Sequence, residues 1–353
     1  MQVQSIKSKL GEVKYRSKIV KQQLGKTKLV KNEPVSREFK KMLKGKLKDT
    51  QKVISKLQKQ GITISPYLEV GSEHALRPAL LNSKFGARGF ATDISLYSLA
   101  QASEFARQFG FIKAPQTICA DANNLPFKSN SFPFVLIYET LHHFPDPKPV
   151  LTEIKRVLAP GGLCLIGSDP IEQSLQINLW YRPNKLRNWE KLLKYMLILP
   201  FISHIGKTEV EEGILEDAFS LKVWQNALSI FDKVEVKMRA FPLGPTESVE
   251  KTQKGNWLYP SLKTRIALYL FGGGLQAFCF KSGRVTTPPQ NLKDSIICPD
   301  CLNNKNREIS LKFGQNVTCP NCQNIYYKKK NVLVLLEKNL EKKILPAQWK
   351  SQQ

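Results

Sequence analysis

Residues 120–170 read ADANNLPFKSNSFPFVLIYETLHHFPDPKPVLTEIKRVLAPGGLCLIGSDP, and they are the part of the chain that decides its fold. Two apolar runs, FPFVLIYE at 132–139 and GGLCLIGS at 161–168, are typical of buried strands. A helix-like segment separates them, and Pro160-Gly161-Gly162 predicts a tight turn before the second run because glycine accepts a positive φ. A strand, a helix and another strand in this order indicate a parallel sheet covered by helices.

The same alternation continues on both sides of this stretch. Five more runs read as strands, namely ISPYLEV at 64–70, ARGFATD at 87–93, QTICA at 116–120, FDKVEVKM at 231–238 and GLQAFCF at 274–280. Helix-like segments lie between most of them, which predicts an α/β fold with a mostly parallel sheet. Such sheets bind ligands beyond the carboxyl ends of their strands, so the chemistry is expected there.

Acidic residues lie at or just after the ends of the first three strands. Glu69 precedes Gly71 in YLEVGSEHAL, Asp93 ends ARGFATD, and Asp121 follows QTICA. Three carboxylates at one edge repel each other unless a ligand donates hydrogen bonds to them, as ribose hydroxyls and an adenine amino group do. The helix that follows Gly71 offers free backbone N–H groups to a carboxylate or phosphate. S-adenosylmethionine combines the ribose, the adenine, a carboxylate and a positive centre.

The stretch from Asp121 onward resembles class I S-adenosylmethionine-dependent methyltransferases of the type-11 group. The matching parts are Asp121, Leu125-Pro126-Phe127, Ser131-Phe132, Leu141-His142-His143-Phe144 and Arg156-Val157-Leu158-Ala159-Pro160-Gly161-Gly162. The resemblance covers about residues 62–282. It implies a Rossmann-like, mostly parallel seven-stranded sheet with helices on both faces, in which GLQAFCF is the reversed last strand.

The resemblance also implies a set of cofactor-binding residues, which are Glu69, Gly71, Asp93, Ile94, Asp121, Ala122 and Tyr138. In the family's arrangement Asp93 binds the ribose, and Asp121 with Ala122 binds the adenine. Glu69 and Gly71 lie near the methionine moiety, and Tyr138 lies beside the methyl group. No catalytic residue is assigned; His142 and His143 are the candidates for a general base, with packing and lining of the pocket as the alternative roles.

The predicted reaction is the transfer of a methyl group to a small or lipid-like acceptor by direct displacement. The sulfonium already carries a good leaving group, so positioning the acceptor does most of the work. The fourth strand is followed by YETL rather than by the Asn/Asp-Pro-Pro-Tyr/Phe motif of adenine N6 methyltransferases, and the Pro-Cys nucleophile of 5-methylcytosine enzymes is missing. The first loop has Glu73 and Ala75 where further glycines are expected. A non-catalytic scaffold with a degenerate cofactor loop is therefore an alternative function.

Four of the seven cysteines form the most specific motif in the chain. Cys298-Pro-Asp-Cys301 and Cys319-Pro-Asn-Cys322 are separated by seventeen residues, a spacing that supplies four thiolates to one structural Zn²⁺. The segment resembles zinc ribbons of methyltransferase partner proteins. Its role is either to bind substrate or to brace the catalytic domain. The other cysteines, Cys119, Cys164 and Cys279, lie in predicted strands and are expected to be buried.

The net charge of +25 is concentrated at the two ends of the chain. Residues 1–60 carry 18 Lys and Arg against 4 Asp and Glu, residues 291–353 carry 11 against 5, and residues 61–290 carry 25 against 20. Basic ends suggest contact with RNA, DNA or an anionic membrane surface, and solvated helix faces are the alternative. An RNA methyltransferase that binds RNA through the arm and the ribbon is thus the first alternative function, and the non-catalytic scaffold is the second.

The predicted organisation has five parts. They are a basic N-terminal arm with helices at 1–60, the S-adenosylmethionine-binding domain at 61–284 with a cap or substrate insertion at 170–231, a linker at 285–297, a small C-terminal zinc ribbon at 298–336 and a basic tail at 337–353. The aromatic-rich insertion is suited to covering an apolar acceptor. No signal-peptide pattern and no apolar run of roughly 20 residues is present, so a cytoplasmic protein without a transmembrane segment is expected.

Overall fold

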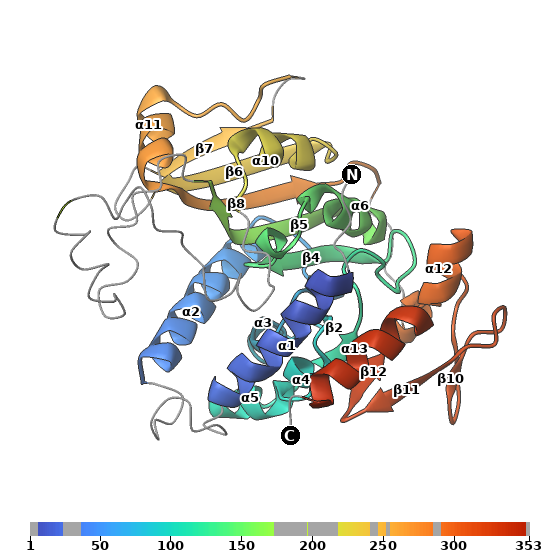
Figure 1. Ribbon diagram of the computed structural model, residues 1–353. Helices are drawn as coiled ribbons and strands as arrows, with labels where there is room; N and C mark the ends of the chain where they lie inside the picture. Colours follow the sequence, from blue (N-terminus) through green and yellow to red (C-terminus); the bar gives the residue numbers. More distant parts are fainter. Residues whose placement is uncertain are drawn as a thin grey trace.

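The computed structural model describes most of the predicted catalytic domain and both of its flanks (Figure 1). The described residues are 6–23, 37–172, 196, 218–240, 246–251, 255–284 and 291–350. Most of the predicted insertion at 170–231, and the first part of the predicted linker, lie outside them. Within the described residues, no helix has both the length and the apolar character needed to cross a bilayer.

A single twisted sheet runs through the molecule (Figure 1). Its strands are β1 Tyr67–Val70, β2 Gly89–Asp93, β3 Gln116–Cys119, β4 Phe132–Tyr138, β5 Leu158–Ile171, β6 Lys233–Ala240, β7 Thr246–Glu250, β8 Gly273–Phe280, β9 Lys312–Phe313, β10 Val317–Thr318, β11 Ile325–Lys329 and β12 Val332–Val334. They lie in the order β7-β6-β8-β5-β4-β1-β2-β3-β12-β11-β10-β9. All seven predicted strands are present, as β1 to β6 and β8.

The central part of the sheet has the predicted directions. β1 pairs in parallel with β2 and β4, β3 continues the parallel set beyond β2, and β5 continues it beyond β4. β8, the predicted reversed strand, pairs antiparallel with β5 and β6. The carboxyl ends of five parallel strands therefore meet at one edge of the sheet, where a ligand site is expected.

The predicted number of seven strands was too low, because the sheet has twelve strands within the described residues. β7 adds to β6, and the segment predicted as a small separate ribbon adds its strands to β3. Leu333 and Val334 of β12 pair in parallel with Ile118 and Cys119 of β3. The edge of β3 offers unpaired backbone groups, and β12 satisfies them as a neighbouring strand would.

Helices cover both faces of the sheet, as predicted (Figure 1). They are α1 Ile6–Gln23, α2 Arg37–Lys59, α3 Leu76–Lys84, α4 Leu96–Leu99, α5 Ala102–Gln108, α6 Pro147–Val157, α10 Leu221–Leu228, α11 Leu262–Phe271, α12 Pro299–Lys305 and α13 Lys338–Lys350, with 3₁₀ turns η1 Leu141–His143 and η2 Leu292–Ser295.

The fourth strand shows how one sequence serves two cores. Successive side chains of a strand point to opposite faces. Val135 and Ile137 join the core under α6 and α10, whereas Phe134 and Leu136 join the core under α2 and α3. A strand buried on both faces reads as a continuous apolar run, which is why FPFVLIYE was identifiable from sequence.

The turn predicted at Pro160-Gly161-Gly162 lies inside β5 as an irregularity of the ladder. Phe132 pairs with Leu158, but Phe134 pairs with Leu163, so the extra residues bulge out between these two pairs. Gly161 has the positive φ, 74°, that the prediction required.

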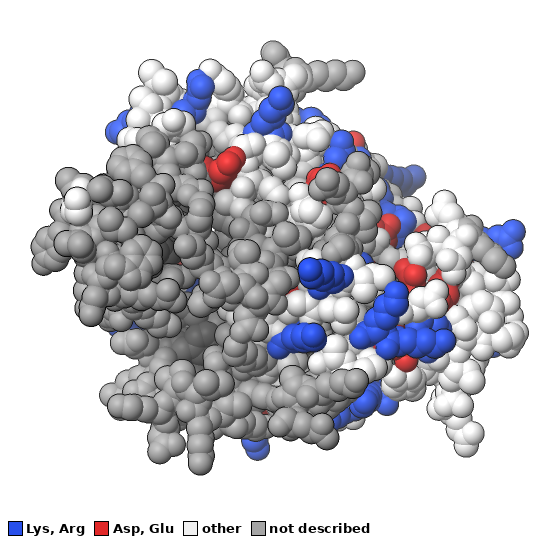
Figure 2. All heavy atoms as spheres, viewed as in Figure 1, with Lys and Arg blue, Asp and Glu red and all other residues white. Residues whose placement is uncertain are grey.

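The two basic ends of the chain fold against each other. α1 packs along α13, and Val13, Leu340 and Ile344 share a core with β12 and α4. Lys7, Lys14, Lys342 and Lys343 stay exposed on these helices. On the face drawn in Figure 2, Lys and Arg outnumber Asp and Glu over the area of α1 and α13.

Candidate functional site

A cavity of about 510 Å³ lies at the carboxyl ends of the parallel strands. Its volume is in the range of pockets that hold small molecules. The cavity is lined by all but one of the predicted cofactor-binding residues, and by both histidines, which together are Gly71, Asp93, Ile94, Asp121, Ala122, Tyr138, His142 and His143. The sheet therefore gathers into one place residues that are up to 72 positions apart in the chain, from Gly71 to His143.

The loop after β1 keeps the backbone of a glycine-rich turn although it has a single glycine. Gly71 has a φ of 68°, and a Cβ there would lie 2.3 Å from Cγ2 of Thr140. Glu73 and Ala75 also have positive φ values, 50° and 55°. Non-glycine residues in this left-handed region are strained by about 1 to 2 kcal/mol each. Glu73 and Ala75 thus hold a conformation that favours glycine, and such backbone strain is typical of a functional constraint.

Asp93 fastens this loop to the end of β2. Its Oδ2 accepts the backbone N–H of Glu73 at 2.8 Å, and its Oδ1 accepts that of Ser95 at 2.8 Å. Burial raises the pKa of the Asp93 carboxyl to about 6, although these two backbone hydrogen bonds oppose the shift. A carboxylate has about four acceptor positions, so both oxygens retain capacity for a ligand hydroxyl.

Asp121 lies between the N-terminal helix and the cysteine-bearing segment. Its Oδ2 forms an ion pair with Lys9 of α1, and its Oδ1 accepts the backbone N–H of Asn123 at 3.0 Å. The next residue, Asn124, donates to the carbonyl of Pro299 at 3.0 Å and to Oε1 of Glu337 at 2.9 Å. The loop after β3 is thus held by parts of the chain that lie far away in sequence on both sides.

Glu69 is the predicted cofactor-binding residue that does not line the cavity. Its side chain is 1% exposed, and its carboxylate lies 3.8 Å from Nη1 of Arg77. Burial raises the pKa of Glu69 to about 8, so the carboxyl is protonated at neutral pH. Arg77 in turn lies over the ring of Tyr138, with 4.2 Å between its Cζ and the ring centroid. Glu69 therefore lies behind Arg77 and Tyr138, which line the cavity.

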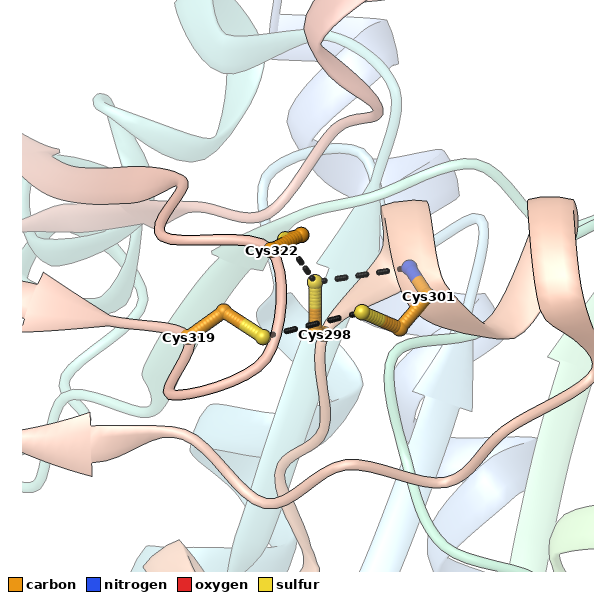
Figure 3. A group of neighbouring side chains, drawn as sticks. All are labelled: Cys298, Cys301, Cys319 and Cys322. Atoms are coloured by element: carbon orange, nitrogen blue, oxygen red, sulfur yellow. Dashed lines mark hydrogen bonds between the residues drawn. The ribbon is translucent and has the colours of Figure 1, made fainter.

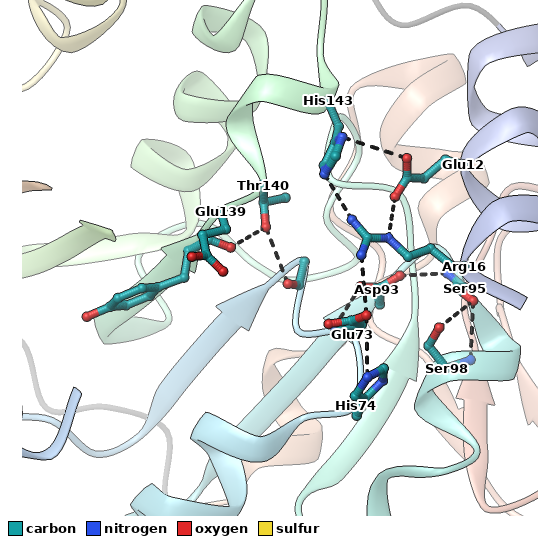
Figure 4. A network of polar contacts seen from close by, with 12 residues as sticks. Glu12, Arg16, Glu73, His74, Asp93, Ser95, Ser98, Glu139, Thr140 and His143 are labelled. Carbon is teal, nitrogen blue, oxygen red and sulfur yellow. Dashed lines mark hydrogen bonds and ion pairs between the residues drawn. The ribbon is translucent and has the colours of Figure 1, made fainter. Parts of the chain in front are cut away.

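Helix α1 contributes a cluster of charged side chains to the cavity (Figure 4). The guanidinium of Arg16 donates from Nε to Glu12 at 2.7 Å and from Nη1 to Glu73 at 3.3 Å. Its Nη2 lies 2.9 Å from Nε2 of His143. Arg16 was not among the predicted site residues, because the lysine-rich arm shows no motif around it.

The two histidines of η1 have different surroundings. Nδ1 of His142 lies 3.0 Å from Oδ1 of Asp169, which also accepts the backbone N–H of His142 at 3.3 Å. Asp169 is fully buried. An imidazole held by a buried carboxylate has the arrangement of an oriented general base. His143 instead faces Arg16 and Glu12 of α1. Asp169 was not predicted; its position at the end of the fifth predicted strand was the available signal.

The four clustered cysteines face one another (Figure 3). Their sulfur atoms all lie within 4.8 Å of one another, with 3.6 Å between Cys298 and Cys322 and 3.6 Å between Cys301 and Cys319. Four sulfurs at about 2.3 Å from a tetrahedral Zn²⁺ are separated by ~3.8 Å, so the cluster has the right size. The other three cysteines, Cys119, Cys164 and Cys279, are buried in strands, as predicted.

Comparison with known proteins identifies the central segment. Residues 68–166 match the family model described as a methyltransferase domain. A malonyl-[acyl-carrier protein] O-methyltransferase of Alcanivorax borkumensis is 41% identical over 96 residues, which are 27% of this chain and 31% of that protein. A demethylmenaquinone methyltransferase of Staphylococcus haemolyticus is 38% identical over 94 residues, 26% of this chain and 38% of that protein.

A more distant relative and a solved structure complete the comparison. A sterol 24-C-methyltransferase of Gibberella zeae is 33% identical over 78 residues, 22% of this chain and 20% of that protein. The crystal structure of a methyltransferase from Aquifex aeolicus gives a TM-score of 0.36 at 16% identity and covers 65% of this chain and 89% of that one. The chain spans about a fifth to two fifths of the length of these three curated relatives.

The matched segment runs from β1 to β5 and includes Gly71, Asp93 and Asp121, which lie at or just after the ends of β1, β2 and β3. It also contains the motifs on which the resemblance was based. Residues 68–166 of this chain therefore carry a methyltransferase domain, and the resemblance to that family is confirmed.

Proposed function

We propose that this chain is an S-adenosylmethionine-dependent methyltransferase that acts on a small or lipid-like acceptor. The observation that carries the proposal is the cavity at the carboxyl ends of β1 to β4, because Asp93 and Asp121 of the matched methyltransferase domain line it. Acidic lining suits a ligand with hydroxyl and amino donors and a sulfonium charge.

Each of the predicted residues in the cavity is proposed to contact one part of S-adenosylmethionine. Asp93 accepts the ribose hydroxyls, with Ile94 beside it, and Asp121 with Ala122 receives the adenine. Gly71 leaves room for the backbone of the first loop to approach the methionine end, because any side chain there would collide with Thr140. Tyr138, at the end of β4, forms the wall next to the methyl group.

The protein's contribution to methyl transfer is mainly orientation. The donor, when bound, supplies the reactive methyl group and its leaving group, so no covalent intermediate with the protein is needed. His142, held by Asp169, is the side chain that would accept a proton from an acceptor that must lose one. An acceptor that is already nucleophilic would need no base, and His142 would then serve only to line the cavity.

The names of the relatives support the proposed acceptor class. Their names specify a malonyl group on a carrier protein, demethylmenaquinone and a sterol. These acceptors are small or lipid-like, and we extend that class to this chain.

RNA is the second candidate acceptor, and the exposed Lys7, Lys14, Lys342 and Lys343 around α1 and α13 favour it. Binding of RNA to filters with a steep salt dependence, together with strong retention on heparin, would support RNA.

The cysteine cluster is proposed to hold a structural Zn²⁺ through Cys298, Cys301, Cys319 and Cys322. Four thiolates fill a tetrahedral shell and leave no position for a substrate. Asn321 donates a hydrogen bond to the sulfur of Cys301 at 3.3 Å, and the hydroxyl of Tyr326 lies 3.0 Å from the sulfur of Cys298. Such outer contacts orient metal ligands.

Titration calorimetry with S-adenosylhomocysteine and the variant Asp93→Ala tests the proposal. The native protein should bind the ligand, and Asp93→Ala should weaken binding by about 10-fold or more, because hydrogen bonds to a charged group contribute roughly 1.5 to 3 kcal/mol. Asp49→Ala, on the exposed side of α2, is the matched control and should bind normally. If the native protein shows no binding at millimolar ligand, the proposal is wrong and the scaffold alternative stands.

A further inference from the structure

The site contains a segment that lies outside the matched methyltransferase domain. Glu12, Tyr15 and Arg16 of α1 line the cavity together with the loop after β1, although Arg16 and Glu73 are 57 positions apart in the chain. The cavity of about 510 Å³ exists with α1 in place. Helix α1 therefore forms one wall of the cavity.

Glu73 creates an electrostatic problem that the domain itself does not solve. Its left-handed backbone presents it at the turn between Gly71 and α3, and its N–H is committed to Asp93. The side chain lines the cavity on the side where the amino-acid end of the donor would lie. A carboxylate here repels the donor's own carboxylate, since like charges in a partly buried site are weakly screened.

The neighbours of Glu73 decide its charge. Burial opposes its ionisation, but His74 and Arg16 outweigh burial and lower the pKa of Glu73 below its ordinary value. Lys46 also lowers this pKa, and Glu12 alone among the named neighbours raises it. Glu73 is therefore ionised, and the repulsion is present unless a cation compensates it.

Arg16 is the cation placed to compensate it (Figure 4). Its guanidinium lies between Glu73, Glu12 and His143, and all of these contacts come from the cavity wall. A guanidinium has five N–H donors in a planar fork that matches a carboxylate. Its side chain remains 23% exposed. The contacts with Glu12, Glu73 and His143 use one N–H group of each guanidinium nitrogen, so Nη1 and Nη2 each keep an N–H group that can donate to a further carboxylate.

We propose that Arg16 is a specificity-determining residue that receives the amino-acid carboxylate of the methyl donor next to Glu73. Glu73 repels the carboxylate of the donor, and Arg16 of helix α1 offsets this repulsion. The inference rests on the proposed function, because it concerns one end of the same ligand. It makes the N-terminal basic segment part of the cofactor site.

Two ligands separate a charge effect from a structural one. S-adenosylhomocysteine carries the amino-acid carboxylate, whereas 5′-methylthioadenosine has the same nucleoside without it. Arg16→Met removes the charge but retains an apolar stem. We expect it to weaken binding of S-adenosylhomocysteine by about 10-fold or more and to change binding of 5′-methylthioadenosine by less than about 2-fold.

Three further variants complete the calorimetric test. Lys14→Met removes an exposed charge of the same helix and should change neither affinity. Glu73→Gln should bind S-adenosylhomocysteine at least as tightly as the native protein, and adding it to Arg16→Met should restore part of the loss. Glu73→Gln also keeps the inference testable if Arg16→Met does not fold, because weaker binding by Glu73→Gln alone contradicts it.

The outcomes are distinguishable. Native protein that binds neither ligand refutes the proposed function and this inference with it. Native binding with an equal loss of both ligands in Arg16→Met overturns only this inference, since Arg16 would then act by packing α1. Tighter binding in Arg16→Met also overturns it, because α1 would then be an inhibitory segment.

Discussion

Glu69 is buried near the end of β1, with both carboxyl oxygens lacking a hydrogen-bond partner. Burial raises its pKa from 4.5 to about 8, more than Arg77 lowers it. Between these two pH values the unfolded chain carries an ionised Glu69 while the native protein carries a protonated one. The native state therefore binds more protons, and its stability falls as the pH rises through this window.

Glu69→Gln should remove this penalty with almost no change in shape. We expect the variant to match the native protein in stability near pH 4, to gain stability progressively up to pH 8, and to level off above it. The gain at pH 8 should be a few kcal/mol, since one pKa unit corresponds to ~1.4 kcal/mol. Urea denaturation at a series of pH values measures it. A stability difference that does not vary with pH would contradict the raised pKa.

Ala75 provides a second test at the scale of one residue, because it is fully buried and holds a φ of 55° at the N-cap of α3. Glycine accepts this φ without strain but loses more entropy on folding. Ala75→Gly should stabilise the protein by about 0.5 to 1 kcal/mol. Ala79→Gly, in the interior of the same helix, should destabilise it by about 1 kcal/mol or more. Urea denaturation of both variants checks the contrast, and two losses would show that Ala75 is not strained.

At the scale of elements, the parallel core of the sheet was predictable because its strands are buried on both faces. β4, fully apolar from Phe132 to Ile137, is the clearest case, and Asp93 and Asp121 mark the ends of their strands. A one-dimensional pattern identified these features because each depends on residues close together in sequence. The zinc-ligand spacing was visible for the same reason.

The parts that sequence did not reveal depend on contacts between distant segments. Val332–Val334 is too short for its pairing with β3 to be predicted from a sequence pattern. The predicted sheet of seven strands therefore did not include it. Arg16 lies in a helix with little amphipathic character, and nothing around it in sequence indicates a partner near Glu73. Glu73 itself was visible as a departure from a glycine-rich loop. The ion pair of Glu73 with Arg16 was not visible in the sequence, because Arg16 belongs to helix α1.

At the scale of the whole molecule, the cysteine-bearing segment braces the loop that is proposed to bind adenine. Besides the contacts of Asn124, the backbone N–H of Ile297 donates to Pro126 at 3.0 Å, and that of Lys128 donates to Ser295 at 2.8 Å. These bonds join residues 121–128 to the first cysteine knuckle. A metal that orders the knuckle therefore also orders one side of the cofactor cavity.

Removal of the proposed zinc should weaken binding of the proposed cofactor without any change in the residues that line the cavity. We expect Cys322→Ser, or treatment with a chelator, to release one zinc per chain and to lower the affinity for S-adenosylhomocysteine by about 10-fold. 5′-Methylthioadenosine should lose affinity equally, because the disturbed loop contacts the nucleoside and not the carboxylate. This equality distinguishes the effect from that of Arg16→Met. Metal analysis and calorimetry on the full chain measure both quantities. Loss of zinc with unchanged affinity for both ligands would show that the segment folds beside the domain without supporting its site.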